Sequence, residues 1–286
     1  MNDRNNNWDF IITDNSPFID FQIGEILRYQ DLLWLFVKRD FTTFYKQTIL
    51  GPLWFFIQPL ITTLVFYVAF NRIAKISTDQ TPPILFYMSA IIIWNYFTNC
   101  LNTTAGTFKT NAGIFGKVYF PRLIVPLSMV ISGLAKFFVQ FLLFLGFYLF
   151  YLFIDLNEKI ELTTGLIIFI PLMVLQMAML GQGLGMIISS LTIKYRDLSY
   201  LISFGTQLMM YASPIIYPLS SVPENYKIFI QTNPVTPIIE GFRFIFLGNG
   251  LFDISLLFIS FIMTLAIFTI GLILFNKAEK SFIDTI

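Results

Sequence analysis

Side chains able to do acid–base or metal chemistry are scarce in this chain of 286 residues. It has no histidine, which removes the commonest general base and transition-metal ligand, and its single cysteine, Cys100, excludes an intramolecular disulfide. The carboxylates nearest the apolar stretches, Asp155, Asp197 and Asp253, lie at their boundaries. A membrane-embedded acyl- or glycosyltransferase would need a catalytic histidine or a carboxylate pair, so we expect neither an enzyme nor a metal site.

The sequence also lacks a recognisable binding site for the usual energy sources of transport, a proton or ATP. A proton-coupled transporter normally carries a titratable carboxylate or histidine inside the bilayer. The phosphate-binding pattern Gly-x-x-x-x-Gly-Lys-Ser/Thr does not occur, so a transporter of this sequence would need a separate ATPase. The alternative is a lipid or oligosaccharide flippase that is coupled to an ion through backbone carbonyls and works without an ATPase. An ATP-driven exporter of a small molecule is a further alternative.

Composition places the chain in a membrane. Hydrophobic residues make up 56% of it and charged residues only 12%, with a mean hydropathy of +0.72. A soluble protein carries about 25% charged residues. The net charge of +1 gives no basic excess for nucleic acid. We therefore expect an all-α integral membrane protein in contact with lipids.

Six apolar stretches approach or exceed the roughly 20 residues that cross a bilayer core. Lysine and arginine are more frequent in the flanking segments on one side, which places both termini in the cytoplasm. Lys136 is the one charge inside a predicted span; we expect it to snorkel toward the cytoplasm, and a place in a transport pathway is the alternative. The predicted spans are 51–70, 84–105, 127–154, 162–191, 198–217 and 251–275.

The ends of the chain are predicted to be cytoplasmic. Residues 1–24 do not have the pattern of a secretory signal, and residues 276–286 form a tail after the last span. Between residues 25 and 46, polar positions recur every three to four residues, which predicts an amphipathic helix on the membrane surface rather than on a soluble domain. Its basic residues are Arg28, Lys38, Arg39 and Lys46.

A cytoplasmic segment, 108–122, is too long and too apolar for a simple turn. A short amphipathic helix bounded by Gly113, Gly116 and Pro121 would present Ile114, Phe115 and Tyr119 on one side. Such a side fits a hydrophobic groove on a cytoplasmic partner. The alternative is an interfacial loop that anchors the third span.

The segment 218–250 is dense in proline, as are the residues just before it, so it cannot be one continuous helix. Its apolar parts are unsuited to an exposed loop, and irregular backbone at membrane depth is buried in protein or lines a cavity. We predict two short re-entrant helices, 225–232 and 237–247, that shape the external end of a pathway. The alternative is a hairpin lying flat on the membrane.

Two further features have open interpretations. Tyr67, Tyr96 and Tyr211 are candidate lining residues because a polar-tipped ring within a span needs a partner or water. Gly181 and Gly185 have the Gly-x-x-x-Gly spacing that lets helices approach closely, either within one chain or between two copies.

Several motifs at span boundaries occur in an order similar to that of a known family. They are Arg39-Asp40, Tyr45 to Trp54 with Gln58-Pro59, Lys117 to Arg122 with Pro126, Tyr195 to Leu198, Ser213 to Pro218, and Asn233-Pro234 ahead of Arg243. In this respect nearly the whole chain resembles the membrane (permease) subunit of bacterial ABC exporters for surface polysaccharides, the O-antigen, capsule and teichoic acid exporters.

The resemblance implies a six-span permease domain over 51–275 in the bacterial inner membrane. It implies a homodimer bound to two copies of a separate ABC ATPase, which would hold ATP and Mg while this chain has no cofactor. The substrate would be a lipid-linked polysaccharide, and among such polymers the resemblance favours the O-antigen type.

The resemblance also assigns roles to particular residues. The segment contacting the ATPase would include Lys109, Asn111, Ile114, Phe115, Lys117 and Tyr119. The external gate would include Pro214, Pro218, Pro234, Pro237 and Arg243.

Overall fold

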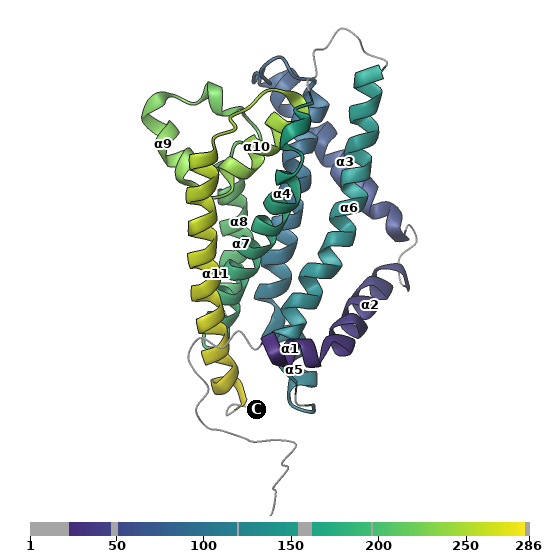
Figure 1. Cartoon of the computed structure of the whole chain (residues 1–286), viewed down its shortest axis with the longest axis vertical. Coiled ribbons are helices and arrows are strands. Elements are labelled where there is room, and N and C mark those ends of the chain that lie inside the picture. The colour runs from purple at the N-terminus through teal and green to yellow at the C-terminus, as the bar shows by residue number, and fades with distance from the viewer. Residues whose placement is uncertain (1–22, 47–50, 119, 154–161, 196, 284–286) are drawn as a thin grey trace, which may run out of the picture.

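The computed structural model describes residues 23–46, 51–118, 120–153, 162–195 and 197–283. The described chain is an elongated helical bundle (Figure 1). The predicted segment 1–24 lies almost wholly outside the described residues, as do Tyr119 and the side chain of Lys46. The principal helices are α1 (Ile23–Arg28), α2 (Gln30–Lys46), α3 (Trp54–Phe66), α4 (Pro83–Ala105), α5 (Thr107–Phe115), α6 (Ile124–Phe153), α7 (Phe169–Thr192), α8 (Leu198–Tyr211), α9 (Glu224–Thr232), α10 (Thr236–Leu247) and α11 (Ile254–Ile283). Shorter 3-10 turns cover Gly51–Leu53, Thr164–Leu166 and Leu219–Ser221, and a π-helical segment, Tyr67–Ile73, extends α3.

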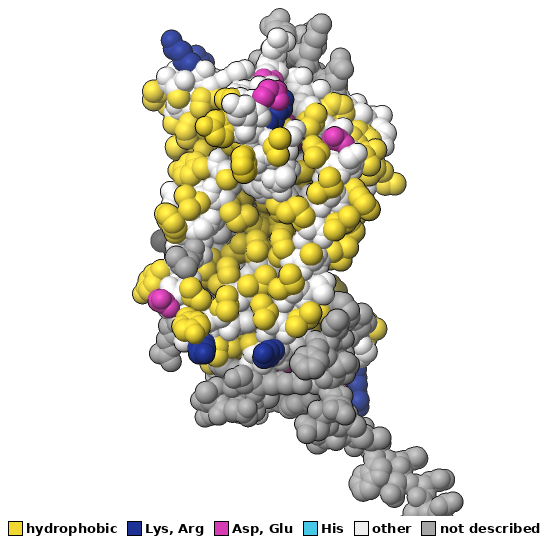
Figure 2. All heavy atoms as spheres, turned by 90° about the vertical axis from the view of Figure 1, so that its left-hand side faces the viewer, with side chains coloured by type: hydrophobic (Ala, Val, Ile, Leu, Met, Phe, Trp, Pro, Cys, Tyr) yellow, Lys and Arg dark blue, Asp and Glu magenta, His cyan; other side chains and the backbone are white. Residues whose placement is uncertain are grey.

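Five helices among the described residues are long and apolar enough to cross a membrane. They are Trp54–Ile73, Pro83–Ala105, Ile124–Phe153, Phe169–Thr192 and Ile254–Glu279. On the face in Figure 2, apolar side chains cover the middle and charged ones gather near the two ends. The all-α membrane fold is therefore confirmed.

The predicted span 198–217 differs from the other five. Its helix, α8, has 14 residues and ends at Tyr211, because the backbone turns ahead of Pro214 and Pro218. At 1.5 Å per residue, α8 is about 21 Å long, and a bilayer core is about 30 Å thick. The count of six spans therefore stays a prediction.

Helices α4 and α7 form the centre of the bundle. Within their most apolar windows, 78% of α4 and 67% of α7 is buried, compared with 11% for Trp54–Ile73. A Cβ on Gly181 would lie 2.7 Å from the Phe97 carbonyl oxygen, and a Cβ on Gly185 would lie 2.6 Å from Thr104 Cβ. These two glycines therefore bring α7 against α4 within one chain.

The two helices predicted in the proline-rich segment are present, within one residue of the predicted starts, as α9 and α10. They lie at the end of the bundle opposite α5 (Figure 1). Helix α10 is buried, with Phe242 and Phe246 packed on Phe144 of α6, and it ends at Gly248 with a left-handed φ of 71°. In α9, Phe229 is exposed. Of the two helices, only α10 inserts into the bundle.

The predicted helix 25–46 is two helices, since the chain turns at Tyr29 between α1 and α2. Helix α2 is set at a slant beside α6 (Figure 1). Phe36 is buried, its ring 5.7 Å from that of Phe120, whereas Trp34 and Leu35 are exposed. Helix α2 therefore has one side packed on the bundle and one side exposed, which suits a helix at a membrane surface.

Candidate functional site

A polar cavity of about 470 Å³ lies among α2, α4, α5 and α6, toward the end of the bundle that carries α5. This volume is within the range of small-molecule sites. Its wall is unusual for a membrane bundle because it is made mainly of polar side chains. They are Arg39, Asp40, Thr43, Asn99, Asn102, Thr103, Thr110, Asn111, Ser132 and Lys136.

Lys136 belongs to this cavity. Its Nζ donates a hydrogen bond of 3.3 Å to Asn99 Oδ1 on α4, and Nζ is also 5.7 Å from the centroid of the Phe55 ring. Whether Lys136 snorkels toward the cytoplasm or belongs to a transport pathway stays a prediction. Its ammonium is directed across α6 toward α4, because the asparagine carbonyl there supplies an acceptor.

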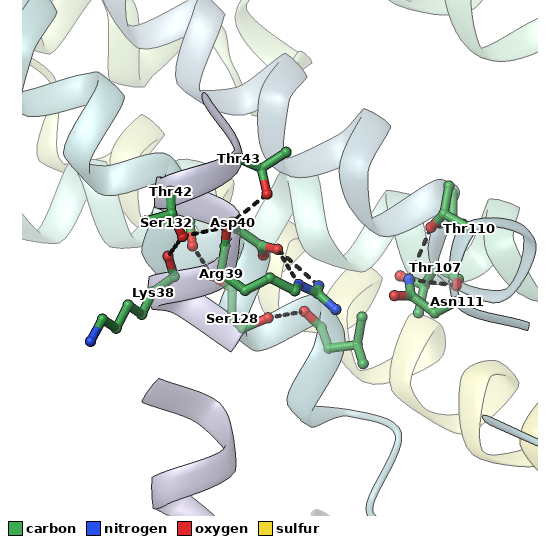
Figure 3. A network of polar contacts seen from close by, with 12 residues as sticks. Lys38, Arg39, Asp40, Thr42, Thr43, Thr107, Thr110, Asn111, Ser128 and Ser132 are labelled. Atoms are coloured by element: carbon green, nitrogen blue, oxygen red, sulfur yellow. Dashed lines mark hydrogen bonds and ion pairs between the residues drawn. The ribbon is translucent and has the colours of Figure 1, made fainter. Parts of the chain in front are cut away.

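The interface helix supplies an ion pair to the same cavity. Arg39 Nε and Nη2 lie 2.9 and 2.8 Å from Asp40 Oδ1, and the guanidinium lies 4.6 Å from the centroid of the Phe36 ring. Figure 3 shows this pair on α2, near Ser132 of α6, with Lys38 pointing away. Of the basic residues predicted on this helix, Arg28 and Lys38 are exposed and Arg39 lines the cavity.

The expected contact segment forms α5 and a turn at Gly116 and Lys117, and Pro121 is buried. Lys109, Lys117 and Val118 are exposed, and Ile114 is half-buried against the bundle. These exposed side chains form the outer surface of the segment at its end of the bundle.

The expected orientations of Phe115 and Asn111 need correction. The Phe115 ring is 5% exposed and lies 6.0 Å from the Phe108 ring and 5.8 Å from the Phe120 ring. Asn111 donates hydrogen bonds to the Thr107 carbonyl and the Thr110 hydroxyl (Figure 3). Both side chains face inward because the chain's own aromatic and polar groups surround them.

Arg122 fixes this segment to the end of α11. Its Nη1 donates a hydrogen bond of 3.0 Å to the Glu279 carbonyl, and its guanidinium lies 5.2 Å from the centroid of the Phe115 ring. Phe108 stacks on Phe275 of α11 at 4.7 Å. A force applied to the α5 segment therefore reaches α11 through direct contacts.

The three tyrosines predicted to line a pathway have different surroundings. Tyr96 is 4% exposed and packs 5.4 Å from Phe137, which does not fit a lining role in the single chain. Tyr67 accepts a hydrogen bond from Arg72 Nε at 2.6 Å, and Tyr211 is exposed. The structure therefore does not bring the three together.

The end of the bundle opposite α5 contains a buried ion pair. Arg243, 1% exposed, lies with Nη1 3.1 Å from Glu240 Oε1. It also donates hydrogen bonds to the carbonyls of Pro214, Ile215 and Phe86 and lies 3.7 Å above the Phe86 ring. Glu240 Oε2 in turn accepts the Leu251 amide at 3.2 Å. Glu240 was not predicted as a site residue; the signal available was its i,i+3 spacing from Arg243 in an apolar helix.

The predicted gate prolines lie close to this ion pair or to its supports. Pro214, Pro218 and Pro237 are buried. The Pro234 carbonyl accepts the Ser260 hydroxyl at 2.6 Å, and Ser260 in turn accepts Gln176 Nε2. The proline segments are thus tied to α7, α10 and α11.

Comparison with known proteins gives a family match over residues 31–247, described as an ABC-2 type transporter. An O-antigen export system permease protein of Klebsiella pneumoniae is 28% identical over 258 residues, covering 89% of this chain and 94% of its own length. A protein of the same name from Myxococcus xanthus is 23% identical, covering 92% of this chain and 98% of its own. A polysialic acid transport protein of Escherichia coli is 22% identical, covering 86% and 93%.

Proposed function

This chain belongs to the ABC-2 type transporter family, and from that premise we propose that it forms the membrane part of an ATP-driven exporter of a bacterial surface polysaccharide. It is a multi-pass transport subunit rather than an enzyme. The observation that carries the proposal is the coverage of the relatives named for O-antigen export, which match 89 to 92% of this chain and 94 to 98% of their own length.

The substrate proposed is a lipid-linked polysaccharide of O-antigen type. Relatives named for O-antigen export are 23 to 28% identical to this chain, and a relative named for polysialic acid transport is 22% identical. The ordering of these values favours the O-antigen class.

A pathway for such a polymer requires more than one copy. The polar cavity of about 470 Å³ is the size of a small-ligand site rather than of a channel for a chain of sugars. Apolar side chains such as Val65 of α3 and Phe204 of α8 remain exposed. We therefore place the pathway between two copies of this chain, in the bacterial inner membrane.

The energy source is a separate ABC ATPase, in two copies, that binds ATP and Mg. Lys109, Lys117 and Val118 are exposed on and after α5, and this segment contacts the end of α11 through Arg122. Motion of the ATPase against this surface would reach the bundle. The α5 end is then cytoplasmic, together with both termini.

Reconstituted vesicles containing this chain and its ATPase test the proposal. Export of a labelled lipid-linked polysaccharide should require ATP, Mg and both proteins, and should stop when any one is withheld. Export driven by an ion gradient in the absence of the ATPase would contradict the proposal and favour an ion-coupled flippase.

A further inference from the structure

We propose that the 74–82 loop, which joins the π-helical segment Tyr67–Ile73 to α4, is a releasable clasp that Asp79 fastens to the segment 218–250. The clasp closes the end of the bundle opposite α5, where α9 and α10 lie (Figure 1), and must release when polymer is exported. The part that this release plays in export rests on the proposed function. The clasp itself rests on the hydrogen bonds, the backbone conformation and the burial of the loop.

Asp79 is bound to both ends of the segment 218–250. Ser220 Oγ lies 2.8 Å from Asp79 Oδ1 and 2.7 Å from Oδ2, so the hydroxyl donates to the carboxylate. Ser220 belongs to the 3-10 turn Leu219–Ser221, which precedes α9. After α10, Asn249 Nδ2 donates to the backbone carbonyl of Asp79 at 2.9 Å. One residue of the loop therefore ties the start of the segment to its end.

The backbone of the loop is strained. Lys75, Asp79 and Gln80 have left-handed φ values of 55°, 50° and 60°. Residues other than glycine seldom adopt this region, and such strain persists where surrounding contacts hold it. Thr78 and Thr81 are buried and bind each other, with Thr78 Oγ1 donating to the Thr81 carbonyl at 2.9 Å and the Thr81 amide donating to the Thr78 carbonyl at 3.0 Å. Release of the loop would relieve this strain.

The loop also covers the buried ion pair of α10. Thr78, Asp79 and Thr81 line a cavity of about 10 Å³ together with Glu240 and Arg243. That volume holds about one water molecule. Arg243 Nε is buried and has no hydrogen-bond partner among the described residues. Water that entered on release of the loop would supply an acceptor for this N–H, which reduces the free-energy cost of opening.

The contacts of the clasp are weaker than those that hold α10. Ser220 is exposed and Asp79 is half-buried, so water competes for the hydrogen bond between their side chains. Arg243, in contrast, is 1% exposed and donates to the carbonyls of Pro214 and Ile215 inside the bundle. The clasp should therefore release while α10 stays docked.

The other end of the loop leads to the first span. Trp54–Ile73 is the least buried of the five candidate spans among the described residues, at 11%. It ends in the π-helical segment Tyr67–Ile73, and such segments are frequent at functional sites. Release of the clasp would free this end of the span from the segment 218–250. Exposed Val65 belongs to the same span, on the surface where we place the pathway between two copies.

A covalent lock on the clasp tests its release. Asp79→Cys with Ser220→Cys is joined by a short bifunctional methanethiosulfonate before reconstitution with the ATPase; the native Cys100 is buried. Export of labelled polysaccharide should fall at least about tenfold and return after dithiothreitol cleaves the link. The control is Glu224→Cys with Lys227→Cys, an exposed pair within α9, and its crosslink should leave export unchanged.

Two outcomes of this experiment separate the clasp from the proposed function. Equal export by the locked and unlocked forms of the Asp79→Cys, Ser220→Cys chain would overturn the clasp. Absence of export by the parent chain in the same vesicles would contradict the proposed function instead, and the clasp is then tested by hydrogen exchange in the purified full-length chain, which needs no ATPase.

Hydrogen exchange measures how often the loop opens. Asp79→Ala removes the acceptor for Ser220 and should speed exchange of the Thr81 amide at least about threefold, as expected for loss of an exposed hydrogen bond. Asp79→Asn keeps one acceptor oxygen and a side chain suited to left-handed backbone, so its exchange should stay close to that of the parent. Parent-like exchange in Asp79→Ala would overturn the clasp.

The neighbouring serine provides a matched control. The Ser221 hydroxyl donates to the Pro218 carbonyl within its own turn, at 2.8 Å, and does not reach the loop. Ser220→Ala should speed exchange of the Thr81 amide as Asp79→Ala does, whereas Ser221→Ala should leave it unchanged. Equal effects of the two serine substitutions would mean that the turn, rather than its contact with Asp79, sets the opening of the loop, and would overturn the proposal.

Discussion

Arg243 pairs with Glu240 across one turn of α10, with 3.1 Å between Nη1 and Oε1 and both side chains buried. The same guanidinium donates to the carbonyls of Pro214 and Ile215, in the segment that follows α8, and of Phe86 in α4. This one side chain therefore joins three parts of the end of the bundle opposite α5, and a buried charge of this kind is strongly destabilising when its partner is removed.

Arg243→Met should lower the free energy of unfolding by about 3 to 5 kcal/mol, because Glu240 is left buried without its partner. The double variant Arg243→Met with Glu240→Gln should recover part of this loss, since the uncompensated charge is gone. Thermal unfolding in detergent measures both. Lys227 and Glu224 form an i,i+3 pair of similar length on exposed α9, so Lys227→Met serves as the control and should change stability by less than about 1 kcal/mol. Equal losses in Arg243→Met and Lys227→Met would contradict a special role for the buried pair.

The close approach of α7 to α4 makes a second prediction. A Cβ on Gly185 would lie 2.6 Å from Thr104 Cβ and 2.8 Å from the Leu101 carbonyl oxygen, so Gly185→Ala should separate the two helices and lower the melting temperature. Gly146 on α6 has nothing within 4 Å of the same added atom. Gly146→Ala should therefore leave the melting temperature unchanged or raise it, because alanine favours a helix by about 1 kcal/mol over glycine. A wild-type melting temperature for Gly185→Ala would mean that α4 and α7 are not in contact.

A third prediction concerns the surface proposed to contact the ATPase. Val118 is 59% exposed next to Lys117, so Val118→Asp should weaken co-purification with the ATPase while leaving the melting temperature unchanged. Phe115→Ala should instead lower the free energy of unfolding by about 3 to 5 kcal/mol, because the Phe115 ring is part of the core. Measuring association and melting temperature for both variants distinguishes docking from packing. Undiminished co-purification of Val118→Asp would place the ATPase contact elsewhere.

The contrast between Val118 and Phe115 marks the limit of what the sequence predicts. Amphipathic spacing identified a short helix near residue 114 but not which of its sides would be covered. The inner side of this segment packs on two aromatic rings from elsewhere in the chain. Phe275 contacts Phe108, and Phe36 contacts Phe120. These partners come from opposite ends of the chain, and no local pattern indicates that they meet.

The proline-rich segment was more predictable. Proline restricts where a helix begins and ends, so the bounds of α9 and α10 followed from the sequence to within one residue. The length of the apolar stretch 198–217 predicted a longer helix than α8, because apolar residues continue beyond the end of the helix to Tyr217. The cavity was also not predicted, because Asn99 and Lys136 belong to different helices and only their packing makes one site.

Topology provides the last prediction. The sole native cysteine, Cys100, is buried, so single cysteines can be introduced without a reactive background. Lys117, beyond α5, and Tyr226, on α9, are both exposed and lie toward opposite ends of the bundle. With the α5 end in the cytoplasm, a membrane-impermeant maleimide should label Tyr226→Cys in spheroplasts and should label Lys117→Cys only after the membrane is permeabilised. The buried Cys100 of the parent chain should stay unlabelled in both conditions. Labelling of Lys117→Cys in intact spheroplasts would invert the orientation and with it the proposed side of the ATPase, because an ATPase that uses cytoplasmic ATP cannot dock on the external face.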